Sequence, residues 1–159
     1  MSPRERMNGW IALGRRAADG LRPIAPLLTR LVIGVAFFHA GLGKWHHFDN
    51  AVGFFTQLGI PAPAANAAFV STIEVVGGLA LFLGAFTRLF AFLLTPVMLV
   101  AIVTAHRTDI AEAFSRESDK GLTDVVPLVF LTFLLWLIAF GAGPISVDGL
   151  LSRRRRPVA

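Results

Sequence analysis

The sequence contains no cysteine and few charged residues. Without cysteine, the chain cannot form disulfides, carry out thiol redox chemistry or hold a cysteine-ligated metal or iron–sulfur centre. Charged residues make up 16% of the 159 positions, against about 25% in a typical soluble domain, and hydrophobic residues make up 55%. The length fits one domain, and the shortage of charge indicates that much of it lies in a bilayer.

Several functional motifs are also missing. The sequence shows no internal repeat, no glycine-rich phosphate-binding motif and no evident Ser-His-Asp arrangement. The net charge is +5, but the arginines flank apolar runs and do not form a basic stripe interleaved with aromatic residues. We therefore expect no nucleic-acid partner.

Four apolar segments are long enough to cross a bilayer, which takes about 20 helical residues. They cover residues 26–43, 64–84, 89–105 and 122–140, with Pro96 and Pro127 inside the last two. They predict an all-α fold, an integral membrane four-helix bundle, in which a short turn at residues 85–88 makes an antiparallel hairpin. Residues 1–25 are expected to form a basic amphipathic segment, residues 26–140 the transmembrane domain, and residues 141–159 a basic tail.

Lysine and arginine are distributed unevenly between the two ends of the spans. Eleven are expected on one side: Arg4, Arg6, Arg15, Arg16, Arg22, Arg30, Arg88 and Arg153–Arg156. Four are expected on the other: Lys44, Arg107, Arg116 and Lys120. The positive-inside rule then places both termini in the cytoplasm and predicts a multi-pass protein of the bacterial inner membrane.

The ends of the spans suggest further helices at the membrane surface. Residues 4–22 read as an amphipathic interfacial helix; a cleaved signal peptide is the alternative, but no convincing cleavage site follows. In the first outer loop, Phe48, Val52, Phe55 and Leu58 have helical spacing and precede Gly59-Ile60-Pro61. This spacing predicts a short helix that could cover the bundle. The second outer loop, residues 106–121, is expected to hold a short solvated helix.

One acidic residue lies inside the second span. Glu74 is the only charged residue in AAFVSTIEVVGGLALFLG, residues 67–84. At 100° per residue it shares a face with small residues such as Ser71, and small residues let membrane helices approach closely. Glu74 is therefore expected to point into a helix–helix seam. The helix-packing candidates are Gly34, Gly41, Gly77 and Gly78.

The expected partner of Glu74 is Arg30 of the first span. Glu74 lies near the middle of its span, and Arg30 lies about 7 Å along the helix axis from the middle of the first span. His39 has a better depth but is on the opposite face, and Lys44 is expected to reach for the outer interface. An unpaired charge at this depth would cost several kcal/mol, so without a cation Glu74 should be neutral. Two interpretations stay open: Glu74 fixes helix register, or it lines a cavity and handles protons or a ligand's polar head.

Polar residues also gather at the outer ends of the spans. GLGKWHHFDN, residues 41–50, carries Lys44; His106 ends the third span and Asp124 begins the fourth. They could form a polar pocket for a small molecule's head, or an interfacial ring anchored by Trp45. No metal site is expected, since the adjacent histidines 46 and 47 would point in different directions. The candidates for the polar seam or a ligand site are Arg30, His39, Lys44, Ser71, Glu74, Arg88, His106 and Asp124.

These motifs together resemble the DoxX family of small bacterial membrane proteins. The resemblance is carried by RLVIGVAFFHAGLGKW, by the following LGIP and by STIEVVGGLALFLGAFTR. It implies a four-helix membrane protein, and some relatives in this family are subunits of quinone-reducing enzymes or are linked to redox stress. Because the chain has no cysteine, a quinone or a partner would have to carry any electrons.

Three functions remain open. The first is a membrane subunit or quinone-binding module of an oxidoreductase or redox-stress system. It would act with a redox partner subunit, and a quinone is the one cofactor that this chain alone could hold. The second is a non-enzymatic scaffold whose polar seam only holds helices together. The third is a small-solute transporter, which would need a homo-oligomer because four helices enclose little volume.

Overall fold

The computed structural model describes Trp10, Ala12, Gly14 and residues 19–21, 23–114, 119 and 121–154, except for the side chains of residues 153 and 154. These residues are helical apart from short turns and loops. Most of the expected N-terminal amphipathic helix and the end of the arginine tail lie outside them. The helices are α2 (Ile24–His46), α3 (Phe48–Gln57), α4 (Pro63–Leu83), α5 (Thr87–Thr104), α6 (Arg107–Ala113), α7 (Val126–Phe140) and α8 (Val147–Arg154).

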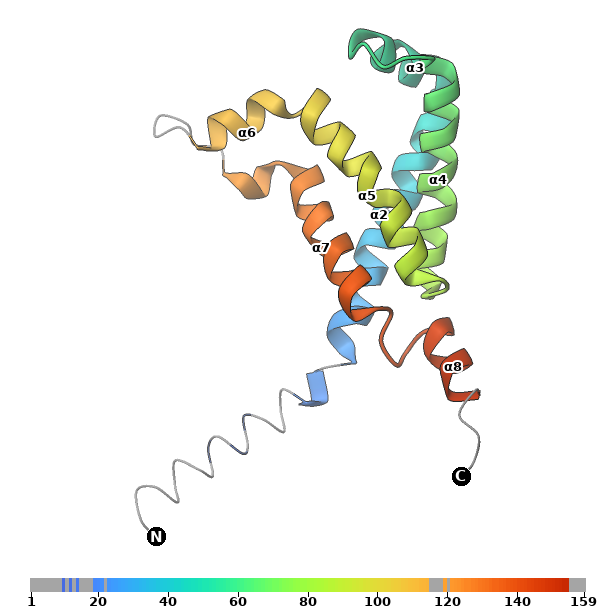
Figure 1. The fold of residues 1–159 in the computed structure, drawn as a ribbon, viewed down its shortest axis with the longest axis vertical. Helices are drawn as coiled ribbons and strands as arrows, with labels where there is room; N and C mark the ends of the chain where they lie inside the picture. The colour runs from blue at the N-terminus through green and yellow to red at the C-terminus, as the bar shows by residue number, and fades with distance from the viewer. Residues whose placement is uncertain are drawn as a thin grey trace.

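Four apolar helices form the bundle (Figure 1). By length and composition, α4, α5 and the helix that contains α2 could each cross a membrane, whereas α7 is shorter, at 15 residues. Their lengths correspond to about 35 Å for α2, 32 Å for α4, 27 Å for α5 and 23 Å for α7, against a hydrocarbon core of about 30 Å. The all-helical membrane bundle expected from the sequence is therefore confirmed.

The fourth helix begins four residues later than the apolar pattern suggested. The apolar pattern suggested a helix over residues 122–140, with Pro127 in its interior. The structure instead has a 3-10 turn at Leu122–Asp124 and begins α7 at Val126, so Pro127 lies in the first helical turn. Proline is tolerated there because it has no N–H to donate and its fixed φ suits a helix start.

The helices α2 and α4 are packed backbone to backbone through glycines. A Cβ added at Gly78 would lie 2.4 Å from the backbone N of Phe38, and one at Gly34 would lie 2.8 Å from the carbonyl O of Gly78. One at Gly41 would lie 2.7 Å from the carbonyl O of Ser71. This seam needs glycine because no side chain fits between the two backbones, and it fixes the register of the antiparallel pair.

A second antiparallel pair is formed by α5 and α7, whose buried leucines make a hydrophobic core with residues of α2 and α4. The two pairs converge at the α4–α5 turn and separate toward α3 and α6 (Figure 1). Gly77 faces Leu94 at the converging end, where an added Cβ would lie 3.0 Å from Leu94 Cδ1. The bundle is therefore tight at one end and open at the other.

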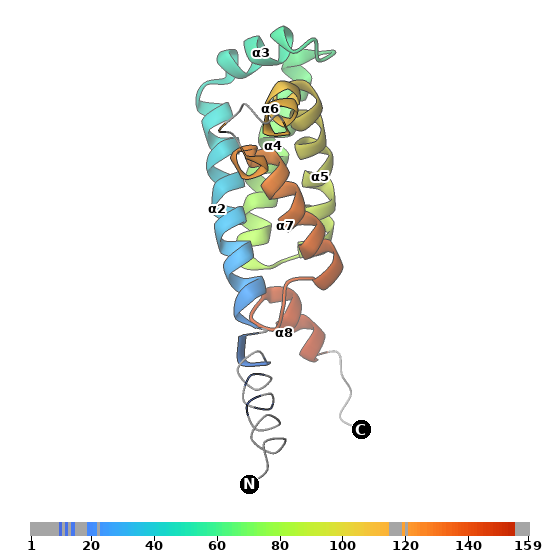
Figure 2. The ribbon, with the colours of Figure 1, turned by 90° about the vertical axis from the view of Figure 1, so that its left-hand side faces the viewer.

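The residues after α7 pack against the bundle, although the sequence suggested only a basic tail. The α4–α5 turn has Gly84 at φ 69° and Phe86 at φ 49°, and no side chain of the turn itself caps α5. The cap comes from α8: both carboxylate oxygens of Asp148 accept hydrogen bonds, from Phe86 N at 2.8 Å and from Thr87 N at 2.9 Å. The C-terminal segment thereby holds the converging end together (Figure 2).

The helices between the spans match the sequence-based expectations. The helix α3 lies across the end of the α2–α4 pair (Figures 1 and 2), and its buried Ala51 and Phe55 pack on Ala67 of α4. Gly59, two residues after α3, adopts the left-handed conformation at φ 70°. The helix α6 has no buried residue, as a solvated helix should. The structure thus places a covering helix over the open end of one helix pair.

Candidate functional site

An ion pair joins α2 to α4 on the wall of the open end. Lys44 Nζ donates to Glu74 Oε2 at 2.5 Å. The side chain of Glu74 is 4% exposed, whereas that of Lys44 is 29% exposed. Among the described residues Lys44 is the polar partner of Glu74. The carboxylate is therefore sheltered by protein, as its helical face predicted, and its charge is balanced by a lysine.

The direction of helical side chains explains why these two residues meet. In an α-helix each Cα–Cβ bond tilts toward the helix N-terminus. Because α2 and α4 are antiparallel, Lys44 leans toward the converging end of the bundle and Glu74 leans toward the α3 end. The register set by Gly41 places Lys44 about one turn closer to α3 than Glu74, so the two side chains point toward each other.

The predicted Arg30–Glu74 pair is wrong for the same reason. Arg30 lies opposite Gly84, where a Cβ added to the glycine would collide with the guanidinium, and this is about ten residues, or about 15 Å, from the level of Glu74. Its side chain leans toward the N-terminus of α2, away from Glu74, and its Nη2 donates to the carbonyl of Ile145. The expectation that Lys44 reaches only for the outer interface is wrong as well.

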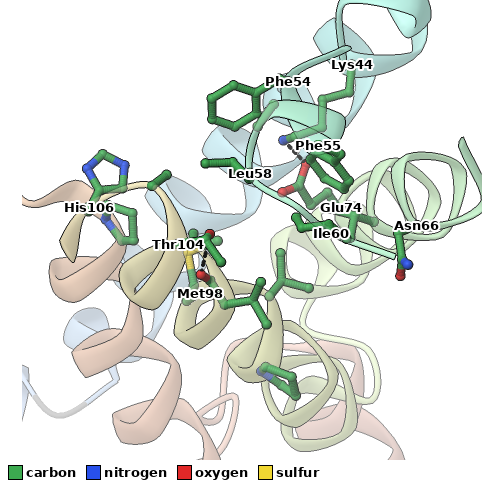
Figure 3. Close-up of a pocket in the computed structure, with 18 of the residues that line it drawn as sticks. Lys44, Phe54, Phe55, Leu58, Ile60, Asn66, Glu74, Met98, Thr104 and His106 are labelled. Carbon is green, nitrogen blue, oxygen red and sulfur yellow. Dashed lines mark hydrogen bonds and ion pairs between the residues drawn. The ribbon is translucent and has the colours of Figure 1, made fainter. Parts of the chain in front are cut away.

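The ion pair borders an apolar cavity of about 400 Å³. The cavity lies between the two helix pairs and beneath α3, and Figure 3 shows Lys44 and Glu74 on one side of it. Its walls are almost entirely aliphatic and aromatic. The apolar lining includes Phe37, Phe55, Leu58, Val70, Val97, Met98 and Phe130. A volume of this size is at the small end of the range for small-molecule pockets.

A histidine forms the opposite polar edge of the cavity. His106, at the end of α5, lines the cavity (Figure 3), and its Nδ1 is 2.8 Å from Asp109 Oδ2. A ring nitrogen held by a carboxylate fixes the orientation of the imidazole. The cavity therefore offers a lysine and a carboxylate at one edge and an imidazole at the other.

The remaining predicted candidates lie elsewhere. Ser71 is buried in the α2–α4 seam and donates to the carbonyl of Ala67 in its own helix. His39 is exposed on the outside of α2. Arg88 lies at the converging end, where its Nη2 donates to Ala139 O at 3.2 Å. Asp124 accepts a hydrogen bond from Gly121 N, which caps the turn before α7. These four do not contribute polar groups to the cavity.

Two features of the site had only weak signals in the sequence. Asn66 lines the cavity and donates to Pro61 O at 2.6 Å, which ties the loop after α3 to the first turn of α4. In the sequence it is a single polar residue among alanines near the start of the second span, which gives no sign of a site. Thr104 also lines the cavity, but its hydroxyl donates to Val100 O, as threonine commonly does inside apolar helices.

The bundle of apolar helices, with a charged pair sheltered inside it, defines a small integral membrane protein. A family model described as DoxX matches residues 25–107, which is the part that contains α2 to α5 and both members of the ion pair. The chain belongs to the DoxX family.

Relatives of the chain occur in several bacteria, and two of them are named as membrane proteins. An uncharacterized membrane protein of Mycobacterium tuberculosis, Rv3486, is 32% identical over 83% of this chain and 84% of its own length. "Putative oxidoreductase CatD" of Bacillus subtilis is 33% identical over 51% of this chain and 59% of its own. The inner membrane protein YphA of Escherichia coli is 32% identical over 54% of this chain and 61% of its own. The matched region thus spans about three fifths of CatD and YphA. No solved structure matches the chain.

Proposed function

We propose that the protein is a membrane-embedded module that binds a quinone, or a small molecule with a similar polar head, as part of an oxidoreductase or redox-stress system of the bacterial inner membrane. The observation that carries this proposal is the position of the Lys44–Glu74 ion pair on the wall of an apolar cavity. A pair that served only to join helices would not need to border a cavity.

The chemistry of the ion pair suits both redox states of a quinone. The ammonium of Lys44 can donate a hydrogen bond to a quinone carbonyl, and a hydrogen bond to a charged group is stronger than a neutral one. The carboxylate of Glu74 can accept a hydrogen bond from a quinol hydroxyl. The imidazole of His106 lies at the other edge of the cavity, where a second quinone oxygen could be bound. The apolar walls would hold the ring.

The chain needs a partner for electron transfer. It has no cysteine, and the side chains around the cavity carry no electrons themselves, so the electrons that reduce a bound quinone must come from another subunit or cofactor. The name of CatD, which describes an oxidoreductase, supports a place in such a system. We therefore propose a redox partner subunit, and a module that binds and positions the quinone.

The direct experiment is a quinone assay on the purified protein. Organic extraction of protein purified in mild detergent should release a quinone in a fixed ratio to the chain, and added quinone should bind with saturable affinity. Glu74→Gln should weaken binding of the quinol by about tenfold, because it removes the charged acceptor. Protein that is always empty, and that binds no added quinone, would contradict the proposal.

A membrane scaffold is the second candidate function, because the glycine seam between α2 and α4 would hold the bundle together without any ligand. In a scaffold, Glu74→Gln would alter only the thermal stability. A Glu74→Gln protein that folds normally, yet binds quinol more weakly and fails to complement a deletion strain, would decide against the scaffold.

A further inference from the structure

The cavity is flanked by side chains that face outward from the bundle. Phe69 of α4 and Val100 of α5 both border it, yet they are 61% and 49% exposed. Pro96, on the same side of α5, also borders it and is exposed. A residue that lines a cavity and is at the same time exposed lies at its opening. The gap between α4 and α5 is therefore one mouth of the cavity, and the exposed lining residues Ala40 of α2 and Val126 of α7 mark a second opening.

The mouth lies at the depth of the acyl chains. Phe69 is six residues into α4, or about 9 Å from the α3 end of that helix, and Pro96 is about 12 Å from the end of α5. The hydrocarbon half-thickness of a bilayer is about 15 Å. All three side chains are apolar, as lipid contact requires.

The end of the bundle beneath α3 is edged by apolar side chains. Phe54 and Phe55 of α3 and Leu58, the residue that follows α3, line the cavity at this end (Figure 3), and Phe54 is 49% exposed. Phe55 is packed against Ala67 of α4, which fastens α3 in place. A polar solute arriving from water would have to pass these apolar side chains, whereas a lipophilic molecule could move sideways from the bilayer.

We infer that the cavity takes a long-tailed amphiphile directly from the bilayer, through the mouth between α4 and α5, so that its head reaches Lys44 and Glu74 while its tail remains among Phe69, Pro96 and Val100. This inference rests on the proposed function for the identity of the head and adds the class of ligand and its route. The limited volume supports it, since about 400 Å³ holds a substituted ring but not a long isoprenoid or alkyl chain.

A fluorescence experiment tests the mouth without any ligand. The chain has no cysteine, so Val100→Cys gives one labelling site for a small fluorophore. In vesicles, lipids with brominated acyl chains should quench this label strongly, whereas iodide in the surrounding buffer should not. Quenching by iodide and not by brominated lipid would overturn the inference, because the mouth would then open to water. Cysteine in place of Thr108, exposed on α6, serves as the control and should show the opposite pattern.

A binding experiment tests the tail. In lipid nanodiscs, Val100→Trp should weaken binding of a decyl-tailed benzoquinone by at least about tenfold, and that of the same ring without a tail by less than about twofold. Leu99→Trp is the matched control, because Leu99 is similarly exposed at 46% but does not border the cavity; it should change neither affinity. Equal effects of Val100→Trp on both ligands, or no effect on the tailed one, would overturn the inference.

The two experiments separate this inference from the proposed function. If wild-type protein binds neither quinone, the proposed function fails while the quenching pattern still decides whether the mouth faces lipid. If both quinones bind and Val100→Trp does not distinguish them, the proposed function stands and the lateral route is wrong.

Discussion

Lys44 Nζ lies 2.5 Å from Glu74 Oε2, and this contact joins the last turns of α2 to the middle of α4. It places a charged pair where the two helices leave their glycine seam and begin to line the cavity. The pair is well sheltered on the Glu74 side and partly open on the Lys44 side. It can therefore hold the helices in register and still offer its hydrogen-bonding groups to a ligand.

Removing one member of this pair should destabilise the protein more than removing both. Lys44→Met leaves the buried carboxylate of Glu74 without a partner, and breaking a buried pair in this way costs about 3–5 kcal/mol, somewhat less here because Lys44 is partly exposed. The double variant Lys44→Met/Glu74→Met removes both charges and should recover much of that loss. Thermal unfolding in detergent, read as a double-mutant cycle, measures the coupling.

The control for these variants is the loss of an exposed charge. Arg107→Met removes an exposed cation from α6 and should change the unfolding temperature little, as exposed charges usually do. Purely additive effects of the Lys44 and Glu74 substitutions would show that the two groups do not interact.

The glycine seam should not tolerate even one added methyl group. Gly78→Ala would put a Cβ 2.4 Å from the backbone N of Phe38, so α2 and α4 would have to separate; overpacking of this kind costs about 1–3 kcal/mol. Gly43→Ala is the control, because nothing lies within 4 Å of its added Cβ, and alanine is the better helix former by about 1 kcal/mol.

Thermal unfolding of these two alanine variants should therefore give shifts of opposite sign. Similar shifts for both would mean that close packing at Gly78 is not required.

The C-terminal segment should stabilise the converging end of the bundle through Asp148. Asp148→Ala removes the acceptor of two backbone N–H groups at the start of α5, and loss of a helix cap costs about 1–2 kcal/mol. The amides of Phe86 and Thr87 should then exchange hydrogen faster, as measured by mass spectrometry. Asp148→Asn keeps one acceptor oxygen, so its amide exchange rates should lie between those of the wild type and those of Asp148→Ala. Unchanged exchange in Asp148→Ala would contradict this role of α8.

The charge distribution predicts that both termini are cytoplasmic, with eleven lysines and arginines on that side and four on the other. A fluorescent protein fused to the C-terminus should therefore be bright, and alkaline phosphatase fused there should be inactive. Phosphatase inserted after Gly59, in the loop that follows α3, should be active. The reverse pattern at both positions would show that the orientation is opposite to the predicted one, with the open end of the cavity at the cytoplasmic surface.

Much of the architecture could be predicted from periodic patterns in the sequence. The spacing of Phe48, Val52 and Phe55 predicted α3, and the apolar runs predicted the bundle. The burial of Glu74 followed from the small residues on its helical face. Each of these features depends on residues close together in the chain, whose geometry is fixed by the helix itself.

The partner of Glu74 could not be predicted in this way, because it depends on the register between two helices. The glycine contacts at Gly34, Gly41 and Gly78 set that register, and a shift of a few residues changes which cation is near. Depth estimates from the span centres favoured Arg30 as the partner. In the structure, side chains tilt toward the helix N-terminus, and this tilt brings Lys44, and not Arg30, to Glu74. The cap from Asp148 was missed for a similar reason, since 61 residues separate it from Thr87.

The most direct test of the central claim is an experimental map at side-chain resolution of the protein purified in mild detergent with no ligand added. We expect density in the cavity between α3 and the two helix pairs, in contact with both Lys44 and Glu74, and with its tail leaving between Phe69 and Val100. A map in which α5 is closed onto α4, or in which the carboxylate of Glu74 faces the detergent, would contradict that claim.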